Sequence, residues 1–449
     1  MSKGRFNSPG ILVLGGLFFV PVFLYSFGMA SGPFLIAIVI MLVYLVLLVL
    51  NFEIGFLGLI FIRSALDYMK NFDAHGGLNL AAWVSLALIV LGIFYVLYRR
   101  CNILQFEDSK PFLVFLGICA LSLLFSADLT ESLSDWLRLV SVFAVYVLTR
   151  LIFATEAKIR MALTAVMMSA LIPVFLAYYQ LLTGDGTVYD GGQERIVGSF
   201  LHPNAFASYL LIILIFTTAQ MLEGVHFIPK HFMGMFMALT FVIFVLTLSR
   251  GAWIVFILAM VLMGILRYRK LLGILPLVLV GVLALPAVLA RIANIFAPSH
   301  YAGGRSAWEW RLDTWEQIGP MIQQKPWFGH GLSMVEFQFG VLTHNDYLRL
   351  LAEVGVVGLL AYLYLALSTL FRTWQDYRQS EAPIVQSFQI GVIAMMAAFL
   401  VREFADNTLR NAVVMIYFWI FIALVRNITL LYADRTSSGK LKIKIQRYD

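Results

Sequence analysis

Long apolar stretches follow one another along nearly the whole chain, separated by short polar connections. Most cover about 17 to 25 residues, the length at which a helix crosses roughly 30 Å of hydrocarbon. The segment at 54–66 is shorter, and a re-entrant segment is the alternative there. The pattern predicts an all-α, polytopic integral membrane protein. The stretches lie near residues 10–30, 32–50, 54–66, 79–98, 111–127, 135–153, 160–182, 204–222, 232–249, 252–268, 272–291, 346–371, 386–402 and 412–430.

The composition agrees with a single multi-spanning membrane domain over residues 1–449. Hydrophobic residues make up 61% of the chain and charged residues 13%, whereas soluble domains are about half apolar and about a quarter charged. This balance excludes a water-soluble globule. Residues 292–345 are predicted to form one large loop, and residues 431–449 a basic cytoplasmic tail. The apolar stretch after MSKGRF is interpreted as the first membrane helix, because no cleavage site precedes a soluble domain.

The basic residues indicate how the helices are oriented. The net charge is +7, but most Lys and Arg lie in short connections, where they act as topology signals; we therefore expect no nucleic-acid binding. A cytoplasmic N-terminus places the basic connections inside, as the positive-inside rule requires. The inside residues are Arg99, Arg100, Lys158, Arg160, Lys230, Arg267, Arg269, Lys270, Arg372, Arg378, Lys440, Lys442, Lys444 and Arg447.

Three connections on the opposite side carry positive charge that orientation does not explain. They are residues 183–203, the Ser249-Arg250-Gly251 break and the loop 292–345, in which WEWRLDTWEQIGPMIQQ is typical of an amphipathic helix. An anionic ligand on the outer side would account for these charges. The residues concerned are Arg195, Arg250, Arg291, Arg305, Arg311, Lys325 and Arg349.

His344 precedes an apolar helix in THNDYLRLLAEVGVVGLL, at the outer surface in this orientation. A histidine titrates near neutral pH, so it could accept a proton from a hydroxyl nucleophile. The alternative is a histidine that merely begins an interfacial helix. Glu353 lies more than two helical turns further on, too far to orient His344 without a bend.

Several arginines are candidates for binding an anion. Arg250 lies between two apolar stretches, where an unpaired charge costs about 2.5 to 3.5 kcal/mol, and the alternative is a turn arginine that snorkels to the interface. Arg195 precedes a helix predicted to begin around Pro203 and Asn204, where free N–H groups favour an anion; the alternative is an exposed loop charge. Arg138 is expected near the same outer cavity.

These residues match the demands of glycosyl transfer from a lipid diphosphate. Arginines can hold the leaving diphosphate bidentately, and a histidine can take the proton of the acceptor hydroxyl. The sequence shows no Asp-x-Asp pair and no His/Cys cluster, and Cys101 and Cys119 lack metal-type spacing. We therefore expect no metal and no cofactor.

At these positions the chain resembles the O-antigen ligase/polymerase superfamily, over most of residues 110–430. The family pattern of His, then Asn, Ser or Gln, nine residues, Gly, two residues and Gly is complete as His344, Asn345, Gly355 and Gly358. The segment GSFLHPNAFASYL after Arg195, the LSRGAW turn with Arg250, and RLDTW followed by KPWFGHGL are also similar.

The resemblance implies a metal-independent, inverting glycosyltransferase of the multi-spanning, GT-C-like class. Members of the family often have about twelve spans, whereas the apolar stretches number about fourteen, so about 12 to 14 transmembrane helices are expected. By position, Arg195 and Arg250 would hold the diphosphate of an undecaprenyl-diphosphate glycan, and His344 would be the base. Weaker candidates for substrate binding are Arg138, Arg305, Arg311, Asn345 and Arg349.

The acceptor would be a glycan or glycolipid, and the active site would face the periplasm from the inner membrane of a bacterium. Membrane lipid and polysaccharide export or chain-length machinery are the implied partners. A polymerase is slightly favoured over a ligase that transfers to lipid A-core or protein. The alternative of another class is a transporter or flippase for lipid-linked sugars, and a third is a scaffolding membrane protein.

Overall fold

The computed structural model describes residues 51–65, 67, 80–190, 193–223, 229–294 and 306–437. The chain divides into two units, Met1–Ile62 and Arg63–Asp449. Of the first, the description covers Asn51 and helix α3 (Phe52–Ile62). The predicted segments 10–30 and 32–50, residue Arg305 and the end of the basic tail lie outside the described residues.

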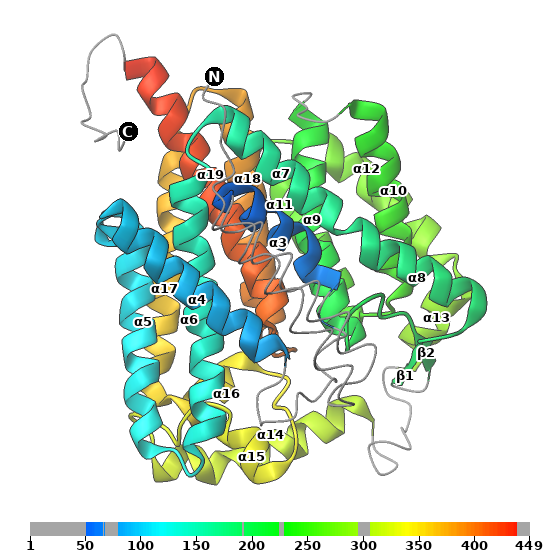
Figure 1. The fold of residues 1–449 in the computed structure, drawn as a ribbon. Coiled ribbons are helices and arrows are strands. Elements are labelled where there is room, and N and C mark those ends of the chain that lie inside the picture. The colour runs from blue at the N-terminus through cyan, green and yellow to red at the C-terminus, as the bar shows by residue number, and fades with distance from the viewer. Residues whose placement is uncertain are drawn as a thin grey trace, which may run out of the picture. The chain divides into compact units, whose positions relative to one another are not determined.

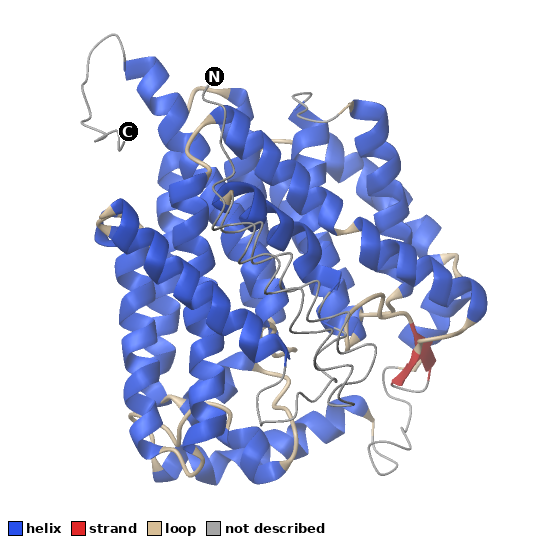
Figure 2. Cartoon of the chain, viewed as in Figure 1, coloured by secondary structure: helices blue, strands red, loops and turns tan. Residues whose placement is uncertain are grey.

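Helices make up almost all of the described part of the second unit, and a short hairpin pairs β1 (Val188–Asp190) antiparallel with β2 (Gln193–Arg195) (Figure 2). Short 3₁₀ turns also join helices, among them η2 (Ile103–Gln105), η3 (Leu123–Phe125) and η5 (Thr408–Arg410). The helices are α4 (Leu80–Arg99), α5 (Ser109–Ser122), α6 (Leu129–Ile152), α7 (Glu156–Ser169), α8 (Leu171–Thr183), α9 (Pro203–Glu223), α10 (Lys230–Leu246), α11 (Arg250–Leu266), α12 (Lys270–Leu283), α13 (Pro286–Ala293), α14 (Ala307–Gln324), α15 (Met334–Phe339), α16 (Asp346–Glu353), α17 (Gly355–Gln379), α18 (Pro383–Arg402) and α19 (Ala412–Ser437).

The apolar helices confirm the predicted all-α, polytopic membrane fold. Among the described residues, five helices are long and apolar enough to cross a membrane, or six if the pair α12 and α13, bent by 86°, is one span. Four further apolar helices are shorter. The figure of about 12 to 14 spans stays a prediction. The five are Glu156–Thr183, Pro203–Glu223, Gly355–Gln379, Pro383–Arg402 and Ala412–Ala433.

The centre of the second unit is formed by helices that are apolar on every side. In α9 and α19, 83% and 89% of the most apolar window is buried, which is typical of a helix surrounded by other helices. Helix α19 packs against α6, α9 and α18 (Figure 1). One end of each of these four helices, namely the starts of α6, α9 and α19 and the end of α18, surrounds the site described below.

The large loop contains the amphipathic helix that the sequence predicts. Helix α14 begins with a capping box, in which the Ser306 hydroxyl accepts the N–H of Glu309 and the Glu309 carboxylate accepts the N–H of Ser306. Short helix α15 follows, and α14 to α16 lie together at one end of the second unit (Figure 1).

The predicted apolar segment 346–371 is broken in the structure. Helix α16 ends at Glu353 and α17 begins at Gly355, whose φ is +76°. The segment KPWFGHGL packs its backbone into this break: the N–H of Gly331 donates to the Glu353 carbonyl at 2.8 Å and that of Val356 to the Pro326 carbonyl at 2.8 Å. Gly355 is therefore required by a loop contact, and not by the helix–helix contact that its position in an apolar segment suggests.

We predict that Gly355→Ala strongly destabilises the protein. A Cβ at this position would overlap the carbonyl of Trp327, and the positive φ adds backbone strain of about 1 to 3 kcal/mol. The matched control is Gly281→Ala in α12, where a Cβ meets no atom within 4 Å; it should be neutral or slightly stabilising. Thermal unfolding in detergent measures both, and equal melting temperatures for the two variants would contradict the prediction.

Candidate functional site

A cavity of about 410 Å³ lies where α6, α9 and α19 begin and α18 ends. Most of the residues that line it have polar side chains, among them two histidines, His202 and His344, and Asp406. The remaining polar lining residues are Arg63, Ser85, Ser134, Arg138, Asn204, Ser208, Glu336, Asn407, Thr408, Arg410 and Asn411.

His344 lies on a tightly held turn just before α16. Its φ is +47°, a conformation that non-glycine residues adopt only under constraint. Its backbone N–H donates a hydrogen bond to the Asn407 side-chain oxygen at 2.7 Å. The neighbouring Thr343 carbonyl accepts a hydrogen bond from the Trp315 indole N–H at 2.8 Å. Trp310 packs its ring against the imidazole edge-on, with 5.6 Å between centroids. Helix α14 and the loop after α18 thus fix the histidine from two sides.

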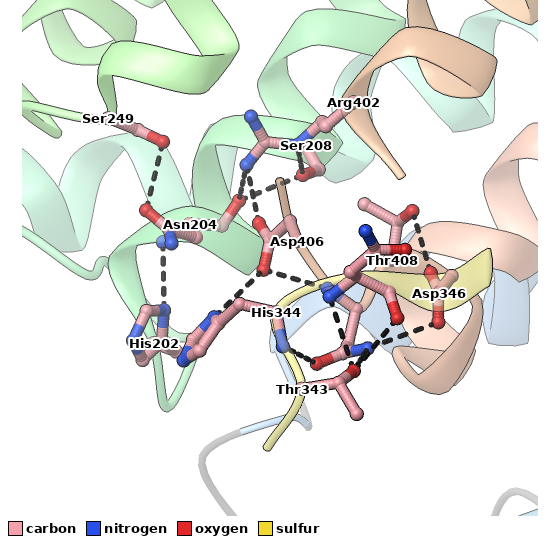
Figure 3. Close-up of polar contacts among 12 residues, drawn as sticks. His202, Asn204, Ser208, Ser249, Thr343, His344, Asp346, Arg402, Asp406 and Thr408 are labelled. Atoms are coloured by element: carbon pink, nitrogen blue, oxygen red, sulfur yellow. Dashed lines mark hydrogen bonds and ion pairs between the residues drawn. The ribbon is translucent and has the colours of Figure 1, made fainter. Parts of the chain in front are cut away.

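Asp346, two residues after His344, joins the two loops of the site. Its fully buried carboxylate accepts from the Leu409 N–H at 2.9 Å and from the Asn407 and Thr408 side chains (Figure 3). Its own N–H donates to the Glu403 carbonyl at 2.8 Å. The loop 403–409 and the start of α16 are therefore joined by several hydrogen bonds.

The imidazole of His344 faces Asp406 (Figure 3). The distance from Nδ1 to the Asp406 carboxylate is 3.9 Å, an ion-pair separation longer than a hydrogen bond. Nδ1 is buried and has no hydrogen-bond partner among the described residues. Catalytic contacts often tighten only when the substrate is bound. With Nδ1 toward the carboxylate, Nε2 is the nitrogen available to the cavity.

Asp406 is held in its ionised form. Burial alone would raise the pKa of Asp406, but the charge of Arg402 and the imidazole of His344 outweigh it, so this pKa lies below the usual value. Arg402 is 2% exposed. Its guanidinium donates hydrogen bonds to the Asp406 carboxylate at 2.9 Å, to the Asn204 carbonyl at 2.9 Å and to the Ser208 hydroxyl at 2.7 Å. Arg402 thereby ties the end of α18 to the first turn of α9.

His202 caps the start of α9 across the cavity. Its Nδ1 accepts the N–H of Asn204 at 3.1 Å, and Pro203 between them is the first residue of the helix. Asn204 is fixed in turn, because its side-chain oxygen accepts from Arg195 at 3.0 Å and from the Ser249 hydroxyl at 2.9 Å.

The two predicted diphosphate ligands, Arg195 and Arg250, do not line this cavity. Arg195 is 2% exposed and donates to the Thr247 carbonyl at 2.9 Å and to Asn204. Arg250, predicted to lie in a break between two apolar stretches, is the first residue of α11 and donates a hydrogen bond to the Arg291 carbonyl at 3.3 Å. Both lie behind the cavity wall that Asn204 forms.

The weaker candidates have different environments. Arg138 lines the cavity and pairs with Asp135. Arg311 lies on α14 and contributes charge near Arg402. Arg349 is buried between Asp346, Glu353 and Asp135, and Asn345 caps α16 through the Leu348 N–H. Arg349 and Asn345 thus support the loop that carries His344.

An apolar groove of about 210 Å³ runs between α10, α11, α12 and α13. Arg250 is the charged residue of its lining, and Trp253 lies one turn further along α11. The Trp253 indole N–H is buried without a hydrogen-bond partner among the described residues. The groove therefore combines an apolar wall with two donors near one end.

The described residues contain no cluster of three or more His, Cys, Asp or Glu side chains with the geometry of a metal site. The cavity instead offers basic residues: Arg410 pairs with Glu336, whereas Arg63 is 2% exposed and its Nε has no hydrogen-bond partner in the described part of the chain. His202, Asp406 and Arg63 were not predicted as site residues, although LHPN shows a histidine just before a helix-starting proline.

We predict that Asp406→Asn destabilises the protein by about 1.5 to 3 kcal/mol, because it weakens hydrogen bonds to buried Arg402. The folded-state pKa of Asp406 lies below its unfolded value, so its stabilisation is present above about pH 4 and is lost as the pH falls through the folded pKa. The difference in unfolding free energy between wild type and variant should be constant from about pH 5 to 8 and shrink in acid.

The control for this substitution is Glu156→Gln, at an exposed pair with Arg160 at 3.6 Å, which should cost about 0.5 kcal/mol or less. Denaturation in detergent at several pH values measures both variants. A wild-type advantage over Asp406→Asn that grows in acid would refute the assignment of Asp406 as an ionised partner.

Comparison with known proteins gives one match. A model of the O-antigen ligase family matches residues 235–363, a range that includes Arg250, Arg311, His344, Asn345 and Gly355. No curated protein matches the chain. The matched range covers the loop helices and the turn on which His344 lies, and it supports placing this polytopic membrane protein in the O-antigen ligase/polymerase superfamily.

Proposed function

We propose that the protein is a membrane glycosyltransferase that moves a glycan from an undecaprenyl-diphosphate donor to an acceptor hydroxyl. The observation that carries this proposal is the polar cavity in which His344 faces the ionised Asp406. The match to the O-antigen ligase family over residues 235–363 supports the reaction class.

His344 acts as the general base in this proposal. Asp406 orients the imidazole through Nδ1, so that Nε2 accepts the proton of the acceptor hydroxyl. The acceptor oxygen then forms a bond to the anomeric carbon while the bond from that carbon to the diphosphate oxygen breaks, and the leaving oxygen keeps the electron pair. Attack from the face opposite the leaving group inverts the configuration, and the reaction needs no metal.

The apolar groove between α10 and α13 supports a lipid-linked donor. An isoprenoid chain would lie against its apolar wall, with its diphosphate near Arg250 and the Trp253 indole. Ser249, which precedes Arg250, is hydrogen-bonded to Asn204 of the cavity wall. The arginine of the groove is thus linked through its neighbour to a residue of the cavity wall, and in this proposal the donor places its lipid in the groove and its sugar in the cavity. Arg195 would position Asn204 at this junction.

The distribution of charge supports an active site on the periplasmic side of a bacterial inner membrane. Arg267 and its partner Glu223 lie at the opposite ends of their helices from the cavity, together with Arg99 and Arg372. These are the ends that the positive-inside rule assigns to the cytoplasm.

Polymerase and ligase activities would use the same groups, and a polymerase for an exported polysaccharide is slightly favoured. A ligase would transfer the glycan to lipid A-core or protein. Export or chain-length machinery would be the partner of a polymerase. A flippase for lipid-linked sugars is the alternative of another class, but it gives no role to the pairing of His344 with Asp406.

We predict that His344→Ala abolishes transfer and leaves donor binding within about twofold of wild type, because a lost base costs about 10²- to 10⁴-fold in rate. The purified protein in lipid would be given an undecaprenyl-diphosphate repeat unit, alone and then with acceptor lipids, and products separated by size. A ladder from donor alone indicates a polymerase, and a single shift only with acceptor indicates a ligase.

The matched control is His231→Ala, at an exposed position near the start of α10, on the end of that helix opposite the cavity. It should keep full activity. Normal turnover by His344→Ala would remove the base assignment, and no histidine-dependent product from wild type under any condition would favour the flippase.

We predict that Arg250→Ala raises the KM for the donor about 10-fold or more, because a charge-assisted contact with the diphosphate is worth about 1.5 to 3 kcal/mol. Steady-state kinetics over a range of donor concentrations measures the effect. Arg160→Ala, at an exposed arginine of α7, is the control and should leave KM unchanged. An unchanged donor KM in Arg250→Ala would show that the diphosphate binds elsewhere.

A further inference from the structure

We propose that Arg63 is a catalytic residue that binds the sugar-linked phosphate of the donor and stabilises this phosphate as it leaves. The inference rests on the proposed function and deepens it, because it names the group that contacts the leaving phosphate in that reaction. Three observations carry it: Arg63 is buried, its Nε has no hydrogen-bond partner among the described residues, and it lines the cavity that contains His344.

Arg63, the first residue of the second unit, is held in the cavity wall by its neighbour Ser64. The Ser64 hydroxyl donates a hydrogen bond to the Ser169 carbonyl at 2.8 Å, and the Ser64 carbonyl accepts one from the Ser199 hydroxyl at 2.8 Å. The backbone beside Arg63 is therefore tied to the end of α7 and to the segment that precedes α9. These contacts fix the position of Arg63 without using its guanidinium.

The guanidinium of Arg63 is buried but incompletely hydrogen-bonded. The residue is 2% exposed, and Nε finds no acceptor in the described part of the chain. The carboxylate of Asp67 acts on Arg63 electrostatically. Burying a charge costs several kcal/mol unless hydrogen bonds and an opposite charge compensate for it, and a phosphate in the cavity would supply both.

Two other arginines belong to the described lining of the cavity, and each has a carboxylate partner. Arg138 pairs with Asp135, and Arg410 pairs with Glu336. To bind a phosphate, either arginine would have to release its carboxylate or share its donors with it. Arg63 is therefore the arginine of this lining that is best suited to take a new anionic partner.

The proposed reaction places one phosphate of the donor beside His344. The acceptor oxygen that gives its proton to His344 attacks the anomeric carbon, so this carbon must lie in the same cavity. The leaving phosphate is bonded to the anomeric carbon through one oxygen and must lie there as well. Arg250 belongs to the lining of the groove and is not part of the described lining of the cavity, so it suits the lipid-linked phosphate.

The first turn of α9 adds to the positive potential of this wall. Asn204 and Ala205, the second and third residues of α9, line the cavity together with Arg63. The N-terminus of a helix of 21 residues carries partial positive charge. The arginine and the helix end would therefore attract the same phosphate.

The step is balanced without a proton from Arg63. The bond from the anomeric carbon to the phosphate oxygen breaks, the electron pair stays on that oxygen, and the acceptor proton goes to His344. Negative charge grows on the sugar-linked phosphate as the bond breaks, so Arg63 attracts this phosphate more strongly in the transition state than in the bound donor. Arg63 should therefore act mainly on kcat, whereas Arg250 should act mainly on the KM for the donor.

Substitution of Arg63 by Met and by Lys tests this role. Arg63→Met removes the charge and keeps much of the length of the side chain, and we expect kcat to fall about 10²-fold with the donor KM within about threefold of wild type. Arg63→Lys keeps the charge without the forked donors and should be at least about 10-fold more active than Arg63→Met. The control is Arg160→Ala, at an exposed arginine of α7, which should keep the wild-type kcat.

Product inhibition separates phosphate binding from a structural role. Undecaprenyl diphosphate carries the full charge of the leaving group, so its inhibition constant should rise about 10-fold or more in Arg63→Met while the donor KM hardly changes. A structural role predicts no such difference between product and donor. Melting temperatures in detergent identify any variant that does not fold.

Several results would overturn the proposal. They are wild-type kcat in Arg63→Met, no gain in Arg63→Lys over Arg63→Met, unchanged product inhibition, or a larger loss of kcat in Arg410→Ala than in Arg63→Met. A loss confined to donors whose repeat unit carries a carboxylate would assign Arg63 to that sugar and would also overturn it. Each of these results, with transfer by wild type that depends on His344, refutes only the role of Arg63, whereas no transfer by wild type refutes the proposed function.

If neither variant folds, a structure of the wild-type protein decides the question. The ligand would be a donor analogue in which a methylene group replaces the glycosidic oxygen, so that it binds but is not transferred. We expect the sugar-linked phosphonate within hydrogen-bond distance of the Arg63 guanidinium. A phosphonate that contacts other basic residues and leaves Arg63 without a contact would overturn the proposal.

Discussion

Asp346 has a fully buried carboxyl group, and the contacts of this group hold the turn that carries His344. Desolvation of an isolated carboxylate costs several kcal/mol, and here Arg349, the Leu409 N–H and two side chains of the loop after α18 contact it. The same contacts hold the backbone next to His344, whose φ is positive. Removing the carboxylate would leave Arg349 buried among fewer partners and would release the loop 403–409, which contains Asp406.

The sequence predicts those parts of the structure that depend on contacts between residues close together in the chain. Apolar length predicts the helices, Pro203 marks the start of α9, and the break predicted at Ser249-Arg250-Gly251 is found at residues 247–249, between α10 and α11. The predicted amphipathic helix of the large loop is α14, because Ser306 and Glu309 close a capping box that lies within four residues. Each of these features depends on contacts between neighbours in the chain.

Other features depend on contacts between distant residues, and the sequence could not predict them. The break at Gly355 exists because the segment around Trp327 packs against it. The apolar pattern is continuous through 346–371 and contains no sign of this contact, so it predicts one unbroken helix. The site brings together His202, His344 and Asp406 from three separate segments. Their mutual distances follow from the packing of α9, α18 and α19, which no motif encodes. His344 was predictable because it begins a helix within a recognisable spacing.

The environment of each arginine decides what it can bind. At the end of the second unit away from the cavity, Arg426 is buried and pairs with Asp108 at 3.0 Å, so its charge is met inside the protein. Arg349 and Arg402 are buried and paired in the same way beside the cavity. A buried arginine is therefore weak evidence for a ligand. Arg63 differs, because it lines the cavity and its Nε has no hydrogen-bond partner among the described residues. Arg250 is the charged residue in the lining of an apolar groove and donates a hydrogen bond to the Arg291 carbonyl. Ser249, next to Arg250, is hydrogen-bonded to Asn204 of the cavity wall, so one contact links the arginine of the groove to the cavity. In the proposed reaction an apolar groove with a charged end suits a donor that combines an isoprenoid chain with an anionic group, and this arrangement, more than the number of outer arginines, supports the proposed lipid diphosphate.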